Sequence, residues 1–273
     1  MANLLLLSSS KTPANPVWMD YAKPHLETFV AEQGLAGQTA VFVPYAAVTI
    51  SSAKYTDMLR PVVERLGMHL TSVHEVDDPV EAICQASVVL VGGGNTYTLN
   101  HLLHEHKLHT AIARHVAQDG IPYIGWSAGA NVAFTSIVTT NDMNGIGTTH
   151  FKGFGFVPCQ LFLNPHFKDA FRWEDLSGDD RAVLEALGTR YPRLGAVLNA
   201  RGESQADRLM EHLEQRSRGR VLGLREGGIL RVRGQSMQLI GEAGMTVFST
   251  SADEPPTEYA PGADVSFLLN PLQ

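Results

Sequence analysis

The chain has 273 residues, of which 44% are hydrophobic and 18% charged, and its net charge at pH 7 is −7. This length suffices for one sizeable domain or two small ones, and the composition is that of an ordinary soluble globular protein. The acidic balance and the lack of a Lys/Arg cluster argue against a nucleic-acid binder. No apolar stretch approaches the length of a membrane helix, so we expect a cytoplasmic protein without membrane partners.

The two cysteines, Cys84 and Cys159, lie far apart in apolar surroundings. This placement predicts buried thiols in a reducing compartment rather than a disulfide framework. It also argues against a metal knuckle, for which the ligands would be closely spaced.

The first half of the chain alternates predicted strands and helices. We expect buried strands at Leu4–Leu7, Ala40–Pro44, His69–His74, Ser87–Val91 and Tyr123–Gly125. Between them, helical spacing predicts helices at Pro16–Gln33, Lys54–Leu66, Asp78–Ala86 and Asn95–Gln118. Apolar strands without internal alternation, separated by helices, are typical of a parallel sheet covered on both faces. In such sheets, chemistry gathers in the loops beyond the carboxyl ends of the strands.

One of these loops contains the pentapeptide Gly125–Gly129 (GWSAG), at the end of a predicted strand. It fits the G-x-S-x-G pattern of a nucleophile elbow, in which a tight strand-to-helix turn exposes the serine, here Ser127. The turn would also aim the N–H of Ala128 at a developing oxyanion. An ordinary strand-to-helix turn is the alternative, because Gly and Ser are common in turns.

A second glycine-rich loop, Gly92–Thr96 (GGGNT), directly follows the most hydrophobic predicted strand. It matches neither a P-loop nor a dinucleotide fingerprint, so it predicts no nucleotide cofactor. It is either a tight turn with Asn95 or Thr96 capping the next helix, or a loop whose N–H groups bind negative charge. As a second oxyanion donor, Gly94 is favoured over Gly93.

A serine nucleophile needs a base, and the chain has 11 histidines. His166 is distinctive because it ends an apolar segment directly after a proline. Five others share one helical stretch, where a solvated surface is a better interpretation than a metal site, since no carboxylate or cysteine completes a ligand set; these are His101, His104, His106, His109 and His115. We therefore expect no metal.

Four elements occur in the order and spacing of one known family, and they are Gly92–Thr96, Tyr123–Asn131 (YIGWSAGAN), Thr139–Met143 (TTNDM) and Asn164–Phe167 (NPHF). The chain thus resembles peptidase E, the α-aspartyl dipeptidase family of serine peptidases, over nearly its whole length. The resemblance implies a three-layer α/β/α sandwich related to the class I glutamine amidotransferase domain. It also implies hydrolysis of dipeptides with an N-terminal aspartate, without a cofactor, and it is compatible with a homodimer.

The same resemblance suggests roles for single residues. Ser127 corresponds to the nucleophile and His166 to the general base. Asp142 corresponds to the aspartate often assigned to the charge relay, and we place it slightly ahead of Glu226, which matches another family carboxylate. Either could have another role, such as binding the substrate's α-amino group. We place four further residues at the substrate, namely Gly93, Asn95, Glu203 and Gln205.

The chain departs from the family pattern after the NPHF element. Residues from Lys168 to about Ala200 are interpreted as a helical insertion, and Gln205 then stands where the family usually has arginine. A glutamine cannot supply the bidentate positive charge that an aspartate side chain calls for. A substitute could be Arg172, Arg181, Arg201 or Arg208; otherwise the substrate preference has moved away from Asp.

The last part of the chain predicts short strands at Val221–Leu224, Ile229–Val232, Met237–Ile240 and Thr246–Ser249. Glycine-containing turns between them favour an antiparallel extension at the sheet edge. A surface loop is expected at Ala252–Gly262, and no linker divides residues 1–273 into more than one domain. The leading hypothesis is a serine exopeptidase for short peptides. The alternatives are a ligand-binding protein without catalysis, and a peptidase or amidase with a preference other than Asp.

Overall fold

The computed structural model describes residues 2–170, 176–198, 203–216, 218–250 and 255–271. Its main sheet has seven strands in the order β3-β2-β4-β5-β1-β8-β9. The first five in that order are parallel, and they are β1 (Asn3–Leu7), β2 (Thr39–Val43), β3 (His69–Ser72), β4 (Val88–Val91) and β5 (Tyr123–Trp126). Two antiparallel strands, β8 (Gly228–Arg233) and β9 (Ser236–Gly241), extend the sheet beyond β1. The predicted α/β fold with a mainly parallel sheet and antiparallel edge strands is confirmed.

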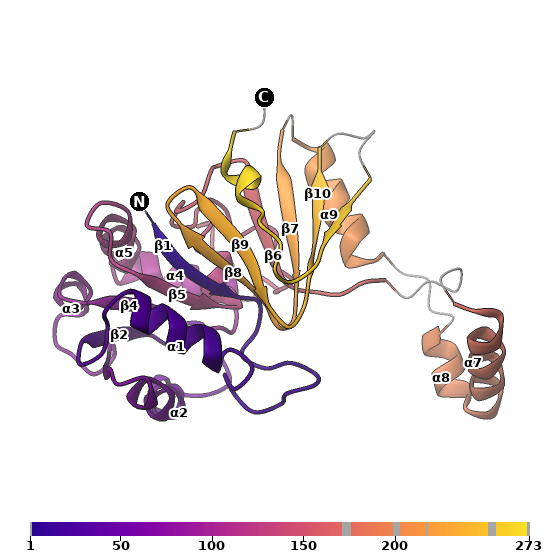
Figure 1. Cartoon of the computed structure of the whole chain (residues 1–273), viewed down its shortest axis with the longest axis horizontal. Coiled ribbons are helices and arrows are strands. Elements are labelled where there is room, and N and C mark those ends of the chain that lie inside the picture. The colour runs from indigo at the N-terminus through magenta and orange to yellow at the C-terminus, as the bar shows by residue number, and fades with distance from the viewer. Residues whose placement is uncertain (1, 171–175, 199–202, 217, 251–254, 272–273) are drawn as a thin grey trace.

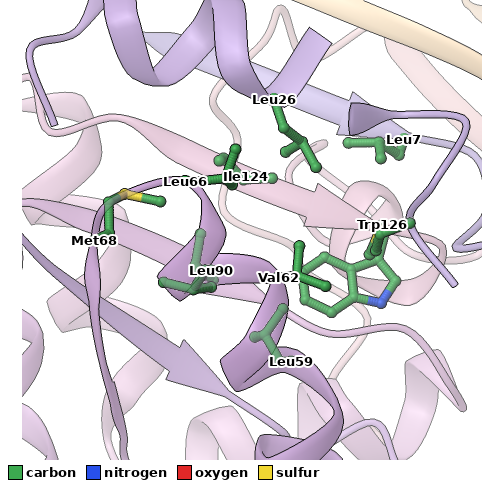
Figure 2. Close-up of a pocket in the computed structure, with 11 residues that line it drawn as sticks. Leu7, Leu26, Leu59, Val62, Leu66, Met68, Leu90, Ile124 and Trp126 are labelled. Atoms are coloured by element: carbon green, nitrogen blue, oxygen red, sulfur yellow. The ribbon is translucent and has the colours of Figure 1, made fainter. Parts of the chain in front are cut away.

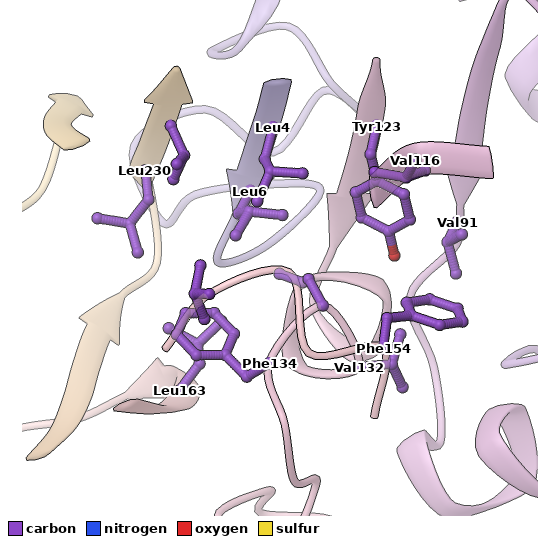
Figure 3. Packing of buried hydrophobic residues seen from close by; sticks show 14 of the residues in the cluster. Leu4, Leu6, Val91, Val116, Tyr123, Val132, Phe134, Phe154, Leu163 and Leu230 are labelled. Atoms are coloured by element: carbon purple, nitrogen blue, oxygen red, sulfur yellow. The ribbon is translucent and has the colours of Figure 1, made fainter. Parts of the chain in front are cut away.

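Helices cover both faces of the main sheet because its strands are apolar on both sides (Figure 1). Leu5 and Leu7 of β1 face α1 (Lys23–Glu32) and α2 (Ser52–Arg65), whose side chains pack on Leu90, Ile124 and Trp126 in Figure 2. Leu4 and Leu6 point to the opposite face. That face is covered by α3 (Pro79–Cys84), α4 (Thr96–Glu105) and α5 (Leu108–Ala117), and its packing is shown in Figure 3.

A second sheet of four strands has the order β11-β10-β7-β6. It consists of β6 (Leu161–Phe167), β7 (Arg220–Arg225), β10 (Met245–Ser249) and β11 (Thr257–Tyr259). Leu163 and Leu222 join the large core beside the main sheet, whereas Phe162 and Val221 pack with α9 (Gln205–Glu214) on the other face. These strands therefore need cover on both faces, and they do not simply extend the main sheet as predicted. The expected loop at 252–262 was also wrong in part, since β11 pairs with β10.

Two helices occupy the segment interpreted as an insertion, α7 (Gly178–Arg190) and α8 (Pro192–Leu198). They pack mainly against each other, and α7 has no buried residue. Figure 1 shows the pair apart from both sheets. Segment 168–200 thus contributes little to the core in the part that the structure describes.

Two predicted helices differ from the observed ones because of backbone conformation. The first begins at Lys23 rather than Pro16, and Met19 has a φ of 59°, which no right-handed helix accommodates. The predicted helix at 95–118 is divided into α4 and α5 at Lys107, whose φ is 61°. Both breaks arise at non-glycine residues, so no local sequence signal marks them.

Burial differs from expectation at the cysteines and at two histidines. Both thiols are exposed: Cys84 ends α3 beside Ile83, which takes the buried position instead, and Cys159 lies in a turn. His109 and His115 of α5 are buried rather than solvated, because α5 packs on α3 and on the core. The prediction of buried thiols and the prediction of a wholly solvated histidine surface were therefore wrong.

Candidate active site

Ser127 stands at the sharp turn between β5 and α6 (Ala128–Asn131). Its backbone has φ 53° and ψ −113°, a conformation that costs a non-glycine residue about 1–3 kcal/mol. Two hydrogen bonds hold the turn: the N–H of Ser127 donates to the Leu7 carbonyl at 2.9 Å, and the Tyr123 hydroxyl donates to the Gly129 carbonyl at 2.6 Å. A Cβ on Gly129 would collide with the Val91 carbonyl, so the turn can lie this close to β4 only with glycine there.

His166 reaches Ser127 from the second sheet. It lies in β6 with a φ of 56°, and its Nε2 is 2.8 Å from the Oγ of Ser127. Its Nδ1 is 2.9 Å from Oε1 of Glu226, the residue directly after β7. In the neutral imidazole, an Nδ1–H that donates to the carboxylate leaves Nε2 to accept the Ser127 hydroxyl proton. This arrangement of donor and acceptor is the one that a serine nucleophile with its base requires.

Two serines that the sequence analysis did not single out support this line of hydrogen bonds. The buried Ser8 follows β1, and its Oγ accepts the backbone N–H of His166 at 2.9 Å while donating to the Leu224 carbonyl at 2.8 Å. The next residue, Ser9, accepts the N–H of Gly227, directly after Glu226, at 3.3 Å. The end of β1 therefore fixes the backbone beside both the histidine and the carboxylate. The only sequence signal is a run of serines after an apolar strand, at a sheet edge where chemistry is expected.

Asp142 contacts Thr96 at the start of α4 and not the imidazole of His166. Its Oδ2 accepts the N–H and the hydroxyl of Thr96, both at 2.7 Å, and the Thr140 hydroxyl at 3.0 Å. Asn95 caps α4, as one of the two interpretations of its loop predicted, and its amide donates to the Met143 carbonyl at 3.0 Å. The structure thus brings Asp142 to the N-terminus of α4, and it brings Glu226 to the imidazole of His166.

Two backbone N–H groups remain available beside Ser127. The neighbours of Gly94 are occupied, because the N–H of Gly93 donates to the Tyr55 hydroxyl and that of Asn95 donates to the Ala46 carbonyl. In the part of the chain that the structure describes, the N–H groups of Gly94 and Ala128 have no protein acceptor. Gly94 has a φ of 140°, and a Cβ there would meet the Ala46 carbonyl, so glycine is required.

The cleft around these groups has a volume of about 580 Å³, which is the size of a small-ligand site. It includes Ser127, His166, Asp142 and all three of Gly93, Gly94 and Asn95, together with an apolar margin formed by Ala46, Ala47, Val48 and Ile50. No lysine or arginine is among the described residues that line it.

The two other predicted substrate residues lie outside this lining. Gln205 accepts the backbone N–H of Lys168 at 2.6 Å, and Glu203 is an exposed side chain 3.7 Å from Arg208. Arg208 is therefore engaged at the surface, and Arg181 lies on α7. Arg172 and Arg201 fall outside the described residues.

Histidines gather at a different place, between α4, α5 and the segment before β6. His104 stacks on His109 and on His150, with ring centroids 4.2 and 4.4 Å apart. Burial lowers the pKa of His109 to about 4, which keeps this ring neutral. Across the described ranges, no group of three His, Cys, Asp or Glu side chains could hold a metal, and no helix is long and apolar enough to cross a membrane.

Comparison with known proteins identifies the family of this chain. The model of peptidase family S51 matches residues 4–240. Peptidase E of Nostoc sp. is 34% identical over 269 residues, covering 98% of each chain, and a probable alpha-aspartyl dipeptidase of Drosophila melanogaster is 36% identical over 267 residues, covering 98% of this chain and 97% of the relative. The crystal structure of a peptidase from an acI-B1 Actinobacterium shares the fold, with a TM-score of 0.64 and 20% identity over 98% of this chain and 97% of that one. The resemblance to peptidase E is confirmed, and the chain belongs to peptidase family S51.

Proposed function

We propose that this serine-type peptidase hydrolyses dipeptides and other very short peptides through an acyl-enzyme on Ser127. The observation that carries the proposal is the continuous line of hydrogen bonds from Ser127 Oγ through His166 to Glu226. In this line Nε2 of His166 can accept the Ser127 hydroxyl proton while Nδ1–H donates to Glu226. The nucleophile sits on a strained turn beside two backbone N–H groups that have no acceptor among the described residues.

In the first half of the reaction, Ser127 Oγ attacks the scissile carbonyl carbon while His166 Nε2 takes the hydroxyl proton. The N–H groups of Gly94 and Ala128 bind the oxyanion of the tetrahedral intermediate. When the C–N bond breaks, His166 gives its proton to the leaving amine and an ester to Ser127 remains. A water molecule then attacks this ester while His166 Nε2 takes a proton from the water, and His166 returns that proton to Ser127 Oγ as the ester bond breaks and the acid leaves. Glu226 holds the imidazole and stabilises its protonated form throughout.

Asp142 gives the cleft a preference for a free N-terminus. Its three hydrogen bonds all use Oδ2, so Oδ1 has no protein donor in the described part of the chain. A carboxylate held in this way at the cleft is suited to the ammonium group of a peptide N-terminus. Because that ammonium and the scissile carbonyl belong to the same residue of a dipeptide, the contact selects exopeptidase substrates.

For the N-terminal side chain we propose aspartate, the residue in the name of the Drosophila melanogaster relative. One observation favours a second candidate, a peptidase for uncharged N-terminal residues. Neither lysine nor arginine is among the described residues that line the cleft, and Gln205 is engaged with the backbone of Lys168. Burying an aspartate side chain without a cation or matching donors would cost binding energy.

A substrate panel separates these possibilities. Asp-X, Glu-X, Asn-X and neutral dipeptides should be compared on the wild type, on Ser127→Ala and on Gln205→Arg. The Ser127→Ala variant should fold normally and lose at least about three orders of magnitude in kcat. Near-normal turnover by that variant would refute the mechanism. Failure of a fluorophosphonate to label Ser127 in the wild type would also refute it, because a ligand-binding protein without catalysis would not react. A panel optimum at neutral side chains would refute only the aspartate preference. If Gln205→Arg then failed to increase Asp-X hydrolysis, position 205 would not be the determinant.

A further inference from the structure

One tyrosine hydroxyl joins the two loops that flank the nucleophile. Tyr55 of α2 is buried, and its hydroxyl donates to the Gly93 carbonyl at 3.0 Å. The same oxygen accepts the N–H of Gly93 at 2.9 Å and the indole N–H of Trp126 at 2.8 Å. Trp126 directly precedes Ser127, so a single hydroxyl connects the glycine loop after β4 with the elbow after β5.

These contacts determine where the N–H of Gly94 points. The Gly93 carbonyl and the Gly94 N–H belong to one planar trans peptide unit, in which the two groups point in opposite directions. A hydrogen bond that holds the carbonyl against Tyr55 therefore directs the N–H away from Tyr55. Three successive glycines, Gly92–Gly94, offer little resistance of their own to a rotation of this peptide unit.

The tyrosine is itself well fixed. Its ring packs edge-on against Phe42 and Trp126, with centroids 5.2 and 6.3 Å apart. Burial raises the pKa of Tyr55 to about 12, so the hydroxyl keeps the proton that it donates. A phenylalanine would preserve the ring contacts and remove only the hydroxyl.

We propose that Tyr55 is a positioning residue of the hydrolytic reaction, whose hydroxyl holds the Gly93–Gly94 peptide with the Gly94 N–H directed at the oxyanion. The inference rests on the proposed roles of Ser127 and Gly94. Tyr55 contacts neither Ser127 nor His166 in the described hydrogen bonds. We therefore expect its hydroxyl to stabilise the transition state and to have little effect on substrate binding.

The test is Tyr55→Phe, with Tyr259→Phe as the matched control, since Tyr259 lies in β11 and packs on Phe267. Removing a whole oxyanion donor costs about 10²–10³ in kcat, so loosening one donor should lower kcat about 10–100-fold with KM within about twofold. The affinity for a peptidyl boronate, which forms a tetrahedral adduct with Ser127, should fall by a similar factor. The affinity for the product amino acid should stay unchanged.

The outcomes separate this inference from the proposed function. An active wild type together with a Tyr55→Phe variant of unaltered kcat and boronate affinity would overturn the positioning role alone. Equal losses of boronate and product affinity would also overturn it, because they would indicate a general structural defect. A wild type that neither turns over peptides nor reacts with the boronate would overturn the proposed function, and the positioning role with it. Trp126→Phe, which leaves the bond to the Gly93 carbonyl in place, should have a smaller effect on kcat than Tyr55→Phe.

Discussion

Replacing Glu226 by glutamine removes the charge beside the imidazole of His166 while preserving size and one oxygen acceptor. The Nδ1–Oε1 distance of 2.9 Å places the two charge centres close together when the imidazole is protonated. At about 4 Å, such a pair is worth about 4 kcal/mol at an effective dielectric constant of about 20. The two side chains are 36% and 32% exposed, so water screens the pair. Taking about half of that energy leaves about 2 kcal/mol. Because the proposed mechanism forms the imidazolium in the transition state, kcat should fall about 30-fold, and up to about 1,000-fold without screening.

The assay is steady-state hydrolysis of the best dipeptide from the panel, with the folding of each variant checked by thermal unfolding. Asp142→Asn is the matched control, since it also neutralises one carboxylate in the cleft. If Asp142 binds the substrate ammonium, its replacement should mainly raise KM, and N-acetylation of the peptide should abolish the difference from wild type. A fall in kcat of less than about threefold in Glu226→Gln, with a large fall in Asp142→Asn, would refute the reasoning and assign the orienting role to Asp142.

Three further predictions concern the surroundings of the site. Ser8→Ala should remove the buried acceptor for the N–H of His166 and cost about 1–3 kcal/mol of stability, measured by urea unfolding, with a reduced kcat; a variant as stable and active as wild type would contradict the support role. The lowered pKa of His109 means that the unfolded chain binds a proton below about pH 6.5 that the folded chain binds only near pH 4. The free energy of unfolding should therefore decrease by up to about 3 kcal/mol as the pH falls from neutral to about 4, and by less in His109→Asn. Parallel curves of unfolding free energy against pH for the wild type and His109→Asn would exclude His109 as the cause. Replacing residues 171–202 by a glycine–serine linker should leave thermal stability nearly unchanged, because α7 and α8 pack mainly on each other; aggregation of that variant would show that the segment covers apolar surface.

The main sheet and the elbow could be predicted because their signals are local. Each parallel strand is a short apolar run, and the glycines of GWSAG and GGGNT are required by close backbone contacts that appear in the structure at Gly129 and Gly94. The capping role of Asn95 also follows from adjacent residues. At these positions one stretch of chain contains both the signal and its physical reason, and prediction and structure agree.

The remaining features depend on contacts between distant segments. Glu226 reaches His166 because β6 and β7 pair with Pro165 opposite Leu224, and 60 residues separate the two side chains in sequence. Ser8 is 158 residues from the backbone that it supports. The burial of His109 likewise depends on the packing of α5. The helix breaks at Met19 and Lys107 lie at residues of positive φ, which helix propensity does not mark.

The hydrogen-bonded residues Ser127, His166 and Glu226 come from both sheets. Ser127 and the two proposed oxyanion donors follow strands of the main sheet, while His166 lies in β6 and Glu226 follows β7 of the second sheet. The C-terminal part of the chain also returns to the main sheet through β8, which pairs with β1. During synthesis, Ser127 is therefore made before His166, the base proposed for it, and before Glu226. If these proposed roles hold, a nascent chain that ends before β6 carries a serine without its base, and full activity awaits the folding of β6 and β7 beside the main sheet.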